Sequence, residues 1–118
     1  MNDIYLLEFE PHLLSHKQEE LGLVFADLDT AVDLMKKEEK VLIAELTLYY
    51  VEKGGYKNMT ELNGHIYSDK KFKDYFDRYK VTLKQRNQAK IRFESFKVFV
   101  DNIRTKAVND REMVKKHL

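Results

Sequence analysis

An apolar residue recurs every three or four positions along the first half of this 118-residue sequence. The repeat consists of Leu21, Phe25, Leu28, Val32, Met35, Leu42, Leu46 and Tyr49, with Glu39 as its one polar position. This spacing lines one face of an α-helix and is typical of helices that pack against another helix. It predicts a first helical region over residues 12–53 that ends at Gly54 and Gly55, with Gly22 as a possible break.

A second repeat of the same kind runs through the other half of the chain. It reads Phe72, Tyr75, Tyr79, Thr82, Arg86, Ala89, Phe93, Phe96, Val100, Ile103 and Ala107. With an N-cap at Ser68-Asp69, it predicts a second helix over 69–109, followed by a C-terminal tail over 110–118. Residues 54–68 lack a clear period and predict a connection that could contain one short helical turn. Only four Gly and one Pro occur in the chain, which favours an all-α fold and one domain.

Two helices joined in this way form a long αα-hairpin, which leaves much of each apolar seam uncovered. Because every copy of the chain carries the same seam, we expect a homo-oligomer. The residues expected at its subunit contacts are Phe25, Leu28, Val32, Leu42, Leu46, Tyr49, Phe93, Phe96, Val100 and Ile103. An N-terminal arm over 1–11, apolar at Ile4 to Leu7 and at Phe9, could dock on its own hairpin or on a neighbouring subunit.

The charges of the chain are divided between its halves. Residues 1–53 hold 12 Asp and Glu against 5 Lys and Arg, whereas residues 54–118 hold 8 against 16. At 100° per residue, one line beside the second seam contains Arg86, Lys90, Lys97, Arg104 and Arg111. A line of cations can follow a phosphate backbone. The alternative is that the acidic helix neutralises the basic helix within the protein.

The sequence therefore predicts a nucleic-acid interface, and it does not separate DNA from RNA. The candidate contact residues are Lys84, Arg86, Lys90, Lys97, Arg104, Lys53 and Lys57. Four tyrosines are candidates for stacking on bases, with burial in the core as the alternative: Tyr49, Tyr50, Tyr56 and Tyr67.

Catalysis, cofactors and membrane insertion have little support in the sequence. Cysteine is absent, and no glycine-rich phosphate loop or nucleophile–base pattern stands out. His12 and His16 have metal-ligand spacing but lack an evident third ligand, so a solvated face is the simpler interpretation. No apolar run approaches the roughly 20 residues of a membrane span, and the acidic N-terminus is unlike a signal peptide. We expect an intracellular, non-enzymatic protein without cofactor.

Short motifs give the chain a family resemblance. Ser68-Asp69-Lys70-Lys71-Phe72 opens the second helix, Phe93-Glu94 and Ile103-Arg104 follow, and Leu48-Tyr49-Tyr50 precedes the glycine-containing loop. Over roughly Lys36 to Val108 the chain resembles the UvsY-type recombination mediators of T-even-like bacteriophages. The resemblance implies a ring-like homo-oligomer of helical hairpins that binds single-stranded DNA. It also implies that the protein helps a RecA-like recombinase displace the single-strand-binding protein, in the cytoplasm of an infected bacterial host.

The chain departs from that family at one place. Members carry basic residues for DNA contact shortly before the tyrosine pair, whereas the stretch from Ile43 to Leu48 has one acid and no cation. DNA contact is then expected on the second helix, where Arg104 matches the family's late arginine, or at Lys36, Lys37, Lys40, Lys53 and Lys57. The other hypothesis is a structural or adaptor protein, such as a phage assembly or regulatory factor, that binds only proteins. Glu39 and Arg86 would then specify register or partner.

Overall fold

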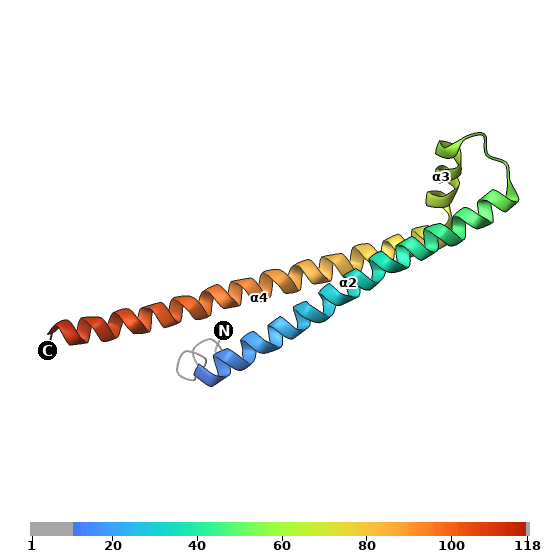
Figure 1. Ribbon diagram of the computed structural model, residues 1–118. Helices are drawn as coiled ribbons and strands as arrows, with labels where there is room; N and C mark the ends of the chain where they lie inside the picture. The colour runs from blue at the N-terminus through green and yellow to red at the C-terminus, as the bar shows by residue number, and fades with distance from the viewer. Residues whose placement is uncertain (1–10, 118) are drawn as a thin grey trace. The chain divides into compact units, whose positions relative to one another are not determined.

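A computed structural model describes residues 11–117, and nearly all of this part of the chain is helical. The helices are α2 (Pro11–Lys53), α3 (Met59–Ser68) and α4 (Lys70–His117), as Figure 1 shows. The described residues contain no strand, which confirms the all-α prediction. The expected N-terminal arm lies outside them, except for Pro11 at the start of α2. A proline suits this first position because its missing N–H would have no helical partner there.

The chain divides into two compact units, and α2 and α4 each contribute to both. Within the described residues, one unit consists of 11–26 and 87–117, and the other is Asp27–Arg86. The Asp27–Arg86 unit is hairpin-like, because it holds the end of α2, all of α3 and the start of α4.

The break at Gly22 that the sequence left open is absent, because α2 continues through this residue. A Cβ at Gly22 would lie 3.1 Å from Cε2 of Phe93, which is closer than most real Cβ contacts. Glycine therefore lets the Phe93 ring approach the α2 backbone. The Phe93 ring also lies parallel to that of Phe25, with 6.3 Å between the centroids and 9° between the planes. Leu14, Ala89 and Val100 are buried in the same unit.

The predicted helix end at Gly54-Gly55 is present. Both glycines have positive φ, 72° and 86°, a region that other L-residues rarely adopt. The Gly54 N–H donates to the carbonyl of Tyr50 at 3.0 Å, which closes α2 with a left-handed C-terminal turn.

The sequence-based prediction for residues 54–68 was wrong, because this connection contains the ten-residue helix α3. Asn58 caps α3 by accepting a hydrogen bond from the Glu61 N–H at 2.9 Å. Glu61 Oε2 in turn accepts from the N–H of Lys57 at 3.1 Å. An Asn followed three residues later by Glu is a known helix-start signal. The sequence analysis did not recognise this signal in residues 54–68.

The predicted C-terminal tail over 110–118 was also wrong, because α4 continues to His117. The apolar repeat fades after Ala107, but the residues that follow include no Gly or Pro. Charged residues such as Lys, Arg and Glu sustain a helix well without an apolar face. The end of the seam was therefore a poor marker for the end of the helix.

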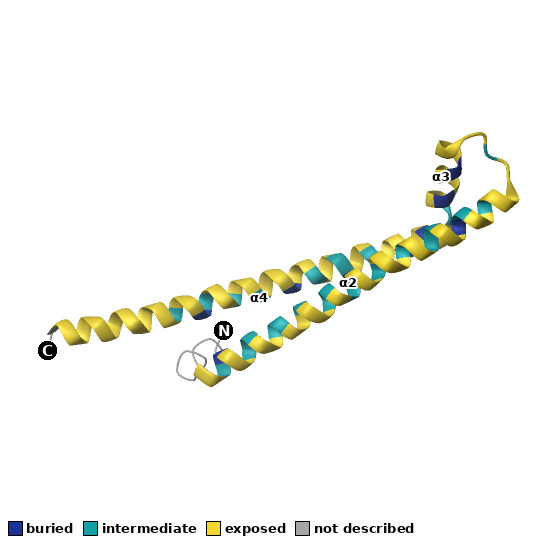
Figure 2. Cartoon of the chain, in the orientation of Figure 1, coloured by how far each residue is buried: buried dark blue, intermediate teal, exposed yellow. Residues whose placement is uncertain are grey.

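A small apolar core lies in the Asp27–Arg86 unit, where all three helices contribute. Its buried members are Leu46 of α2, Leu62 and Ile66 of α3, and Phe72 and Tyr75 of α4. Figure 2 shows buried positions on α3 and on the parts of α2 and α4 beside it. The hydroxyl of Tyr75 donates to the Met35 carbonyl at 2.7 Å, so its polar atom is satisfied inside this core. Burial, and then the nearby Glu39 carboxylate, raises the pKa of Tyr75.

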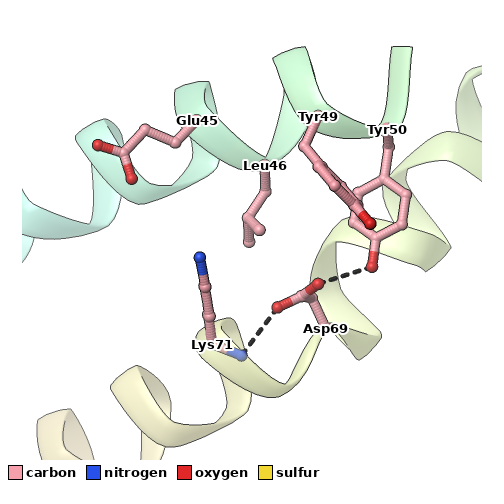
Figure 3. A pocket seen from close by; sticks show the side chains of 6 residues that line it. All are labelled: Glu45, Leu46, Tyr49, Tyr50, Asp69 and Lys71. Atoms are coloured by element: carbon pink, nitrogen blue, oxygen red, sulfur yellow. Dashed lines mark hydrogen bonds between the residues drawn. The ribbon is translucent and has the colours of Figure 1, made fainter. Parts of the chain in front are cut away.

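Asp69 joins the three helices at one residue. Its N–H donates to the Ile66 carbonyl at 3.2 Å, which ends α3. Its Oδ1 accepts from the Lys71 N–H at 2.8 Å, which caps the start of α4. Its Oδ2 accepts from the Tyr50 hydroxyl at 2.6 Å, which ties the junction to α2. The two carboxylate contacts are drawn in Figure 3.

We expect the cap and the Tyr50 contact at Asp69 to act together. Asp69→Ala should lower the free energy of unfolding by about 1–2 kcal/mol, because a capped helix start loses its acceptor. Tyr50→Phe should also lower it, because the hydrogen bond to Asp69 is lost. The double variant should lose less than the sum by roughly 0.5 kcal/mol or more, measured by urea denaturation. Lys70→Ala serves as the control, and fully additive losses would contradict the coupling.

The same contact predicts how stability depends on pH. The hydrogen bond from Tyr50 holds the pKa of Asp69 below its ordinary 3.8, and that bond raises the pKa of Tyr50 above 10.0. The Asp69 contribution is therefore present above 3.8 and lost as pH falls through the lowered pKa. The Tyr50 contribution is present below 10.0 and lost as pH rises through the raised pKa. Thermal unfolding should show both losses in the wild type, and Asp69→Asn should remove the acid loss that this contact causes.

Candidate nucleic-acid interface

One face of α4 carries a row of exposed cations, which we call the basic row: Lys90, Lys97, Arg104 and Arg111. Successive members are seven residues apart, so they lie on one side of the helix at intervals of about 10 Å. No ion pair engages any of them within the described part of the chain. Their charges are therefore available to an anionic partner.

The predicted line began at Arg86, and the structure places this residue differently from the basic row. Arg86 is largely covered, and its Nη1 lies 3.6 Å from Oδ1 of Asp29 on α2. Its Nε is buried and has no hydrogen-bond partner among the described residues. The position of Arg86 indicates a structural contact between α2 and α4.

A second contact of this kind joins Arg78 to Glu38. The guanidinium of Arg78 donates to Glu38 Oε1 at 2.8 Å, and this bond raises the pKa of Arg78. Together with the Arg86–Asp29 pair, it shows that acidic α2 does neutralise part of basic α4 within the Asp27–Arg86 unit. The basic row belongs to the other unit and has no such pairs among the described residues.

Lys84 belongs to another face of α4. It is exposed and shares that face with Lys73 and Lys80, which lie eleven and four residues before it. These three lysines form a separate line within the Asp27–Arg86 unit. The sequence-based list of candidate contact residues included Lys84, although Lys84 was not part of the predicted line of cations that begins at Arg86.

Lys53 and Lys57 lie at the end of α2 and in the loop after it. Lys53 Nζ is 5.9 Å from the ring centroid of Tyr49 and 6.0 Å from that of Tyr50. Lys57 is exposed, and its backbone takes part in the cap of α3. Both are accessible, but they do not form a row.

The four candidate tyrosines differ in exposure. Tyr50 donates to Asp69 and stacks on His65 with 5.5 Å between the ring centroids, and Tyr56 packs against the core. Tyr49 and Tyr67 are exposed over about half of their surface. Of the four, Tyr49 and Tyr67 therefore offer the most open rings to a base.

A hollow of about 300 Å³ lies where α2 meets the start of α4 (Figure 3). It is lined by Glu45, Leu46, Tyr49, Tyr50, Asp69 and Lys71. The two carboxylates outnumber the single ammonium group, and Asp69 is held ionised by its hydrogen bonds. This hollow therefore disfavours phosphate, although it adjoins the tyrosine pair.

The residues expected at subunit contacts are mostly covered within the chain. All but Tyr49 are buried or half-buried, and Phe25 and Phe93 contact each other. Another set of apolar residues on α2, which we call the outer stripe, is exposed: Leu34, Val41 and Leu48. Its members are seven residues apart and lie away from the seam, on one face. Sequence reading followed the longer seam and missed this second period.

The described residues include no group of three or more His, Asp or Glu that could hold a metal ion. His12 and His16 are exposed on α2. Between residues 11 and 117, no helix is both long and apolar enough to cross a membrane.

Comparison with protein-family models, with curated proteins and with solved structures found no match. The resemblance to the UvsY-type mediators therefore rests on the short motifs and helix pattern quoted above.

Proposed function

We propose that this chain is a non-enzymatic recombination mediator of the UvsY type that binds single-stranded DNA as a homo-oligomer, without a cofactor. The observation that carries the proposal is the basic row, whose four cations are exposed and have no ion-pair partner among the described residues. Cations at regular intervals of about 10 Å suit a polyanion better than a compact anionic ligand. The family resemblance supplies the recombination role and the expected partners, a RecA-like recombinase and a single-strand-binding protein.

Self-association raises the affinity of the basic row for a DNA strand. A single row contacts only a few phosphates, so one chain alone would bind weakly and with strong salt dependence. An oligomer presents several rows to one strand, and the later contacts become intramolecular. Many weak contacts hold a strand firmly while each remains exchangeable, a property suited to handing the strand to a recombinase.

Removal of the charges of the basic row tests the proposed DNA contact. Lys90→Gln, Lys97→Gln and Arg104→Gln together should weaken binding to oligo-dT. They should also flatten the plot of log affinity against log salt by about 2 units per engaged chain, at roughly 0.7 per phosphate contact. Fluorescence anisotropy across a salt series measures both effects.

The matched control removes three exposed lysines from α2, at Lys36, Lys37 and Lys40. The loss of net charge is the same, so a general electrostatic effect would flatten both slopes equally. A slope that changes only in the α2 variant would move the DNA contact to α2 and contradict the placement on α4.

The outer stripe favours a second candidate function, that of an adaptor that binds proteins. Leu34, Val41 and Leu48 each expose more than half of their surface, at the seven-residue spacing of helix–helix contacts. Exposed apolar residues in such an arrangement mark a protein-binding face. The same face serves self-association in the mediator proposal, so the two functions differ in whether DNA is also bound.

Val41→Glu tests the role of the outer stripe in self-association. A carboxylate at its centre should move the assembly toward smaller species in sedimentation velocity, because burying an unpaired charge is costly. Lys40→Gln, which lies about 100° around α2 from Val41, is the control and should leave the sedimentation unchanged. An unaltered distribution for Val41→Glu would show that the subunits meet elsewhere.

A further inference from the structure

A groove lined by aromatic rings opens on α3 and α4 within the Asp27–Arg86 unit. Tyr67 is 50% exposed and Phe76 is 45% exposed, whereas Phe72 is buried. The groove has a volume of about 320 Å³ and is lined by Tyr67, Phe72, Lys73, Phe76 and Asp77. All of these residues belong to the Asp27–Arg86 unit.

Phe72 holds the two exposed rings in place. It meets Tyr67 edge-on, with 5.0 Å between the centroids and 79° between the planes. It lies nearly parallel to Phe76, at 6.3 Å and 12°. Because Phe72 is part of the core, both exposed rings are supported from inside the protein. They are therefore pre-positioned for contact with a flat ligand, which lowers the entropic cost of binding.

The three lysines that share one face of α4, namely Lys73, Lys80 and Lys84, flank this groove. Lys73 and Lys80 are seven residues apart and Lys84 follows four later, so the three span about 16 Å along one side of α4. Phe76 lies next to this line, and Lys80 Nζ is 4.9 Å from its ring centroid. Lys80 also lies 3.7 Å from Asp77, but both side chains of this pair are mostly exposed, so a phosphate can compete for the lysine. Lys73 and Lys84 make no ion pair among the described residues.

We propose that Tyr67 and Phe76 form a base-stacking subsite for single-stranded nucleic acid, with Lys73, Lys80 and Lys84 along the phosphates. This inference rests on the proposed function and adds a second kind of contact to it. The basic row has cations beside apolar residues that are covered by the protein. The groove has exposed aromatic rings beside its lysines. Aromatic rings stack on any base, so the subsite gives affinity with little sequence preference.

The chemistry of the groove favours bases over an acidic peptide. Its exposed apolar walls are aromatic, and flat rings suit the faces of bases. The carboxylate of Asp77 in the wall would repel acidic side chains inserted among the rings. In a nucleic-acid strand the phosphates lie outside the stacked bases. A base can therefore enter the groove while the phosphates contact the lysines beside it.

The test compares oligo-dT with an abasic strand of equal length, because both carry the same phosphates and only one carries bases. Wild-type protein should bind oligo-dT roughly tenfold more tightly than the abasic strand. The Tyr67→Leu and Phe76→Leu double variant keeps every charge and should reduce this preference to less than about twofold. Its salt slope should match that of the wild type, because the phosphate contacts remain.

Two further proteins keep the test decisive. Tyr67→Leu alone should lose part of the base preference even if the double variant fails to fold, as judged by circular dichroism. Val81→Ala, an exposed apolar change on α4 in the same unit, should keep the full preference.

The outcomes separate this inference from the proposed function. If wild-type protein binds neither strand, the proposed function fails and the subsite fails with it. If it binds both strands equally, or if the leucine variants keep the preference, the subsite is overturned while DNA binding stands. If these variants keep the preference but lose binding to an acidic, Phe-containing peptide, the groove belongs to a protein partner, and the stacking subsite is also overturned.

Discussion

The arrangement of helices in the Asp27–Arg86 unit depends on the carboxylate of Asp69. One oxygen caps α4, the other accepts from Tyr50 on α2, and the backbone of the same residue ends α3. Leu62 and Ile66 of α3 can then cover a core that two helices alone would leave open. A pair of helices buries only a narrow strip of each, so a third helix held by Asp69 gives this unit a closed apolar centre.

The charge pattern of the chain follows from the same packing. Where α2 and α4 pair in this unit, Arg78 and Arg86 meet acids of α2 and serve the fold. The basic row lies in the other unit and has no ion pair among the described residues, while the lysines beside Phe76 have only an exposed contact with Asp77. The cations of α4 that make no contact with α2 therefore form two separate sets, the basic row and the lysines beside Phe76. We propose that the basic row contacts phosphates and that the other set adds aromatic rings for bases.

The sequence predicted the features that depend on local chemistry and period. The apolar repeats identified both long helices. Gly54 and Gly55 marked the end of α2, because the positive φ angles at this turn favour glycine whatever the rest of the fold. The sequence was wrong about the end of α4, which continues beyond its apolar seam. It left open whether Gly22 breaks α2, because the close approach of Phe93 to Gly22 is a tertiary contact. The helix α3 was missed although Asn58 and Glu61 carry its start signal. For the candidate site, the sequence identified the cations, but only side-chain packing shows that Arg86 is engaged with Asp29.

The central claim is that unpaired cations and open aromatic rings together make this chain a binder of single-stranded DNA. The most direct measurement is a titration of wild-type protein with labelled oligo-dT and with a duplex of equal length, at low and high salt. The account predicts salt-sensitive binding to both, with the single strand bound more tightly at each salt concentration, because paired bases cannot stack on Tyr67 and Phe76. Absence of salt-sensitive binding to oligo-dT, or a consistent preference for the duplex, would contradict it.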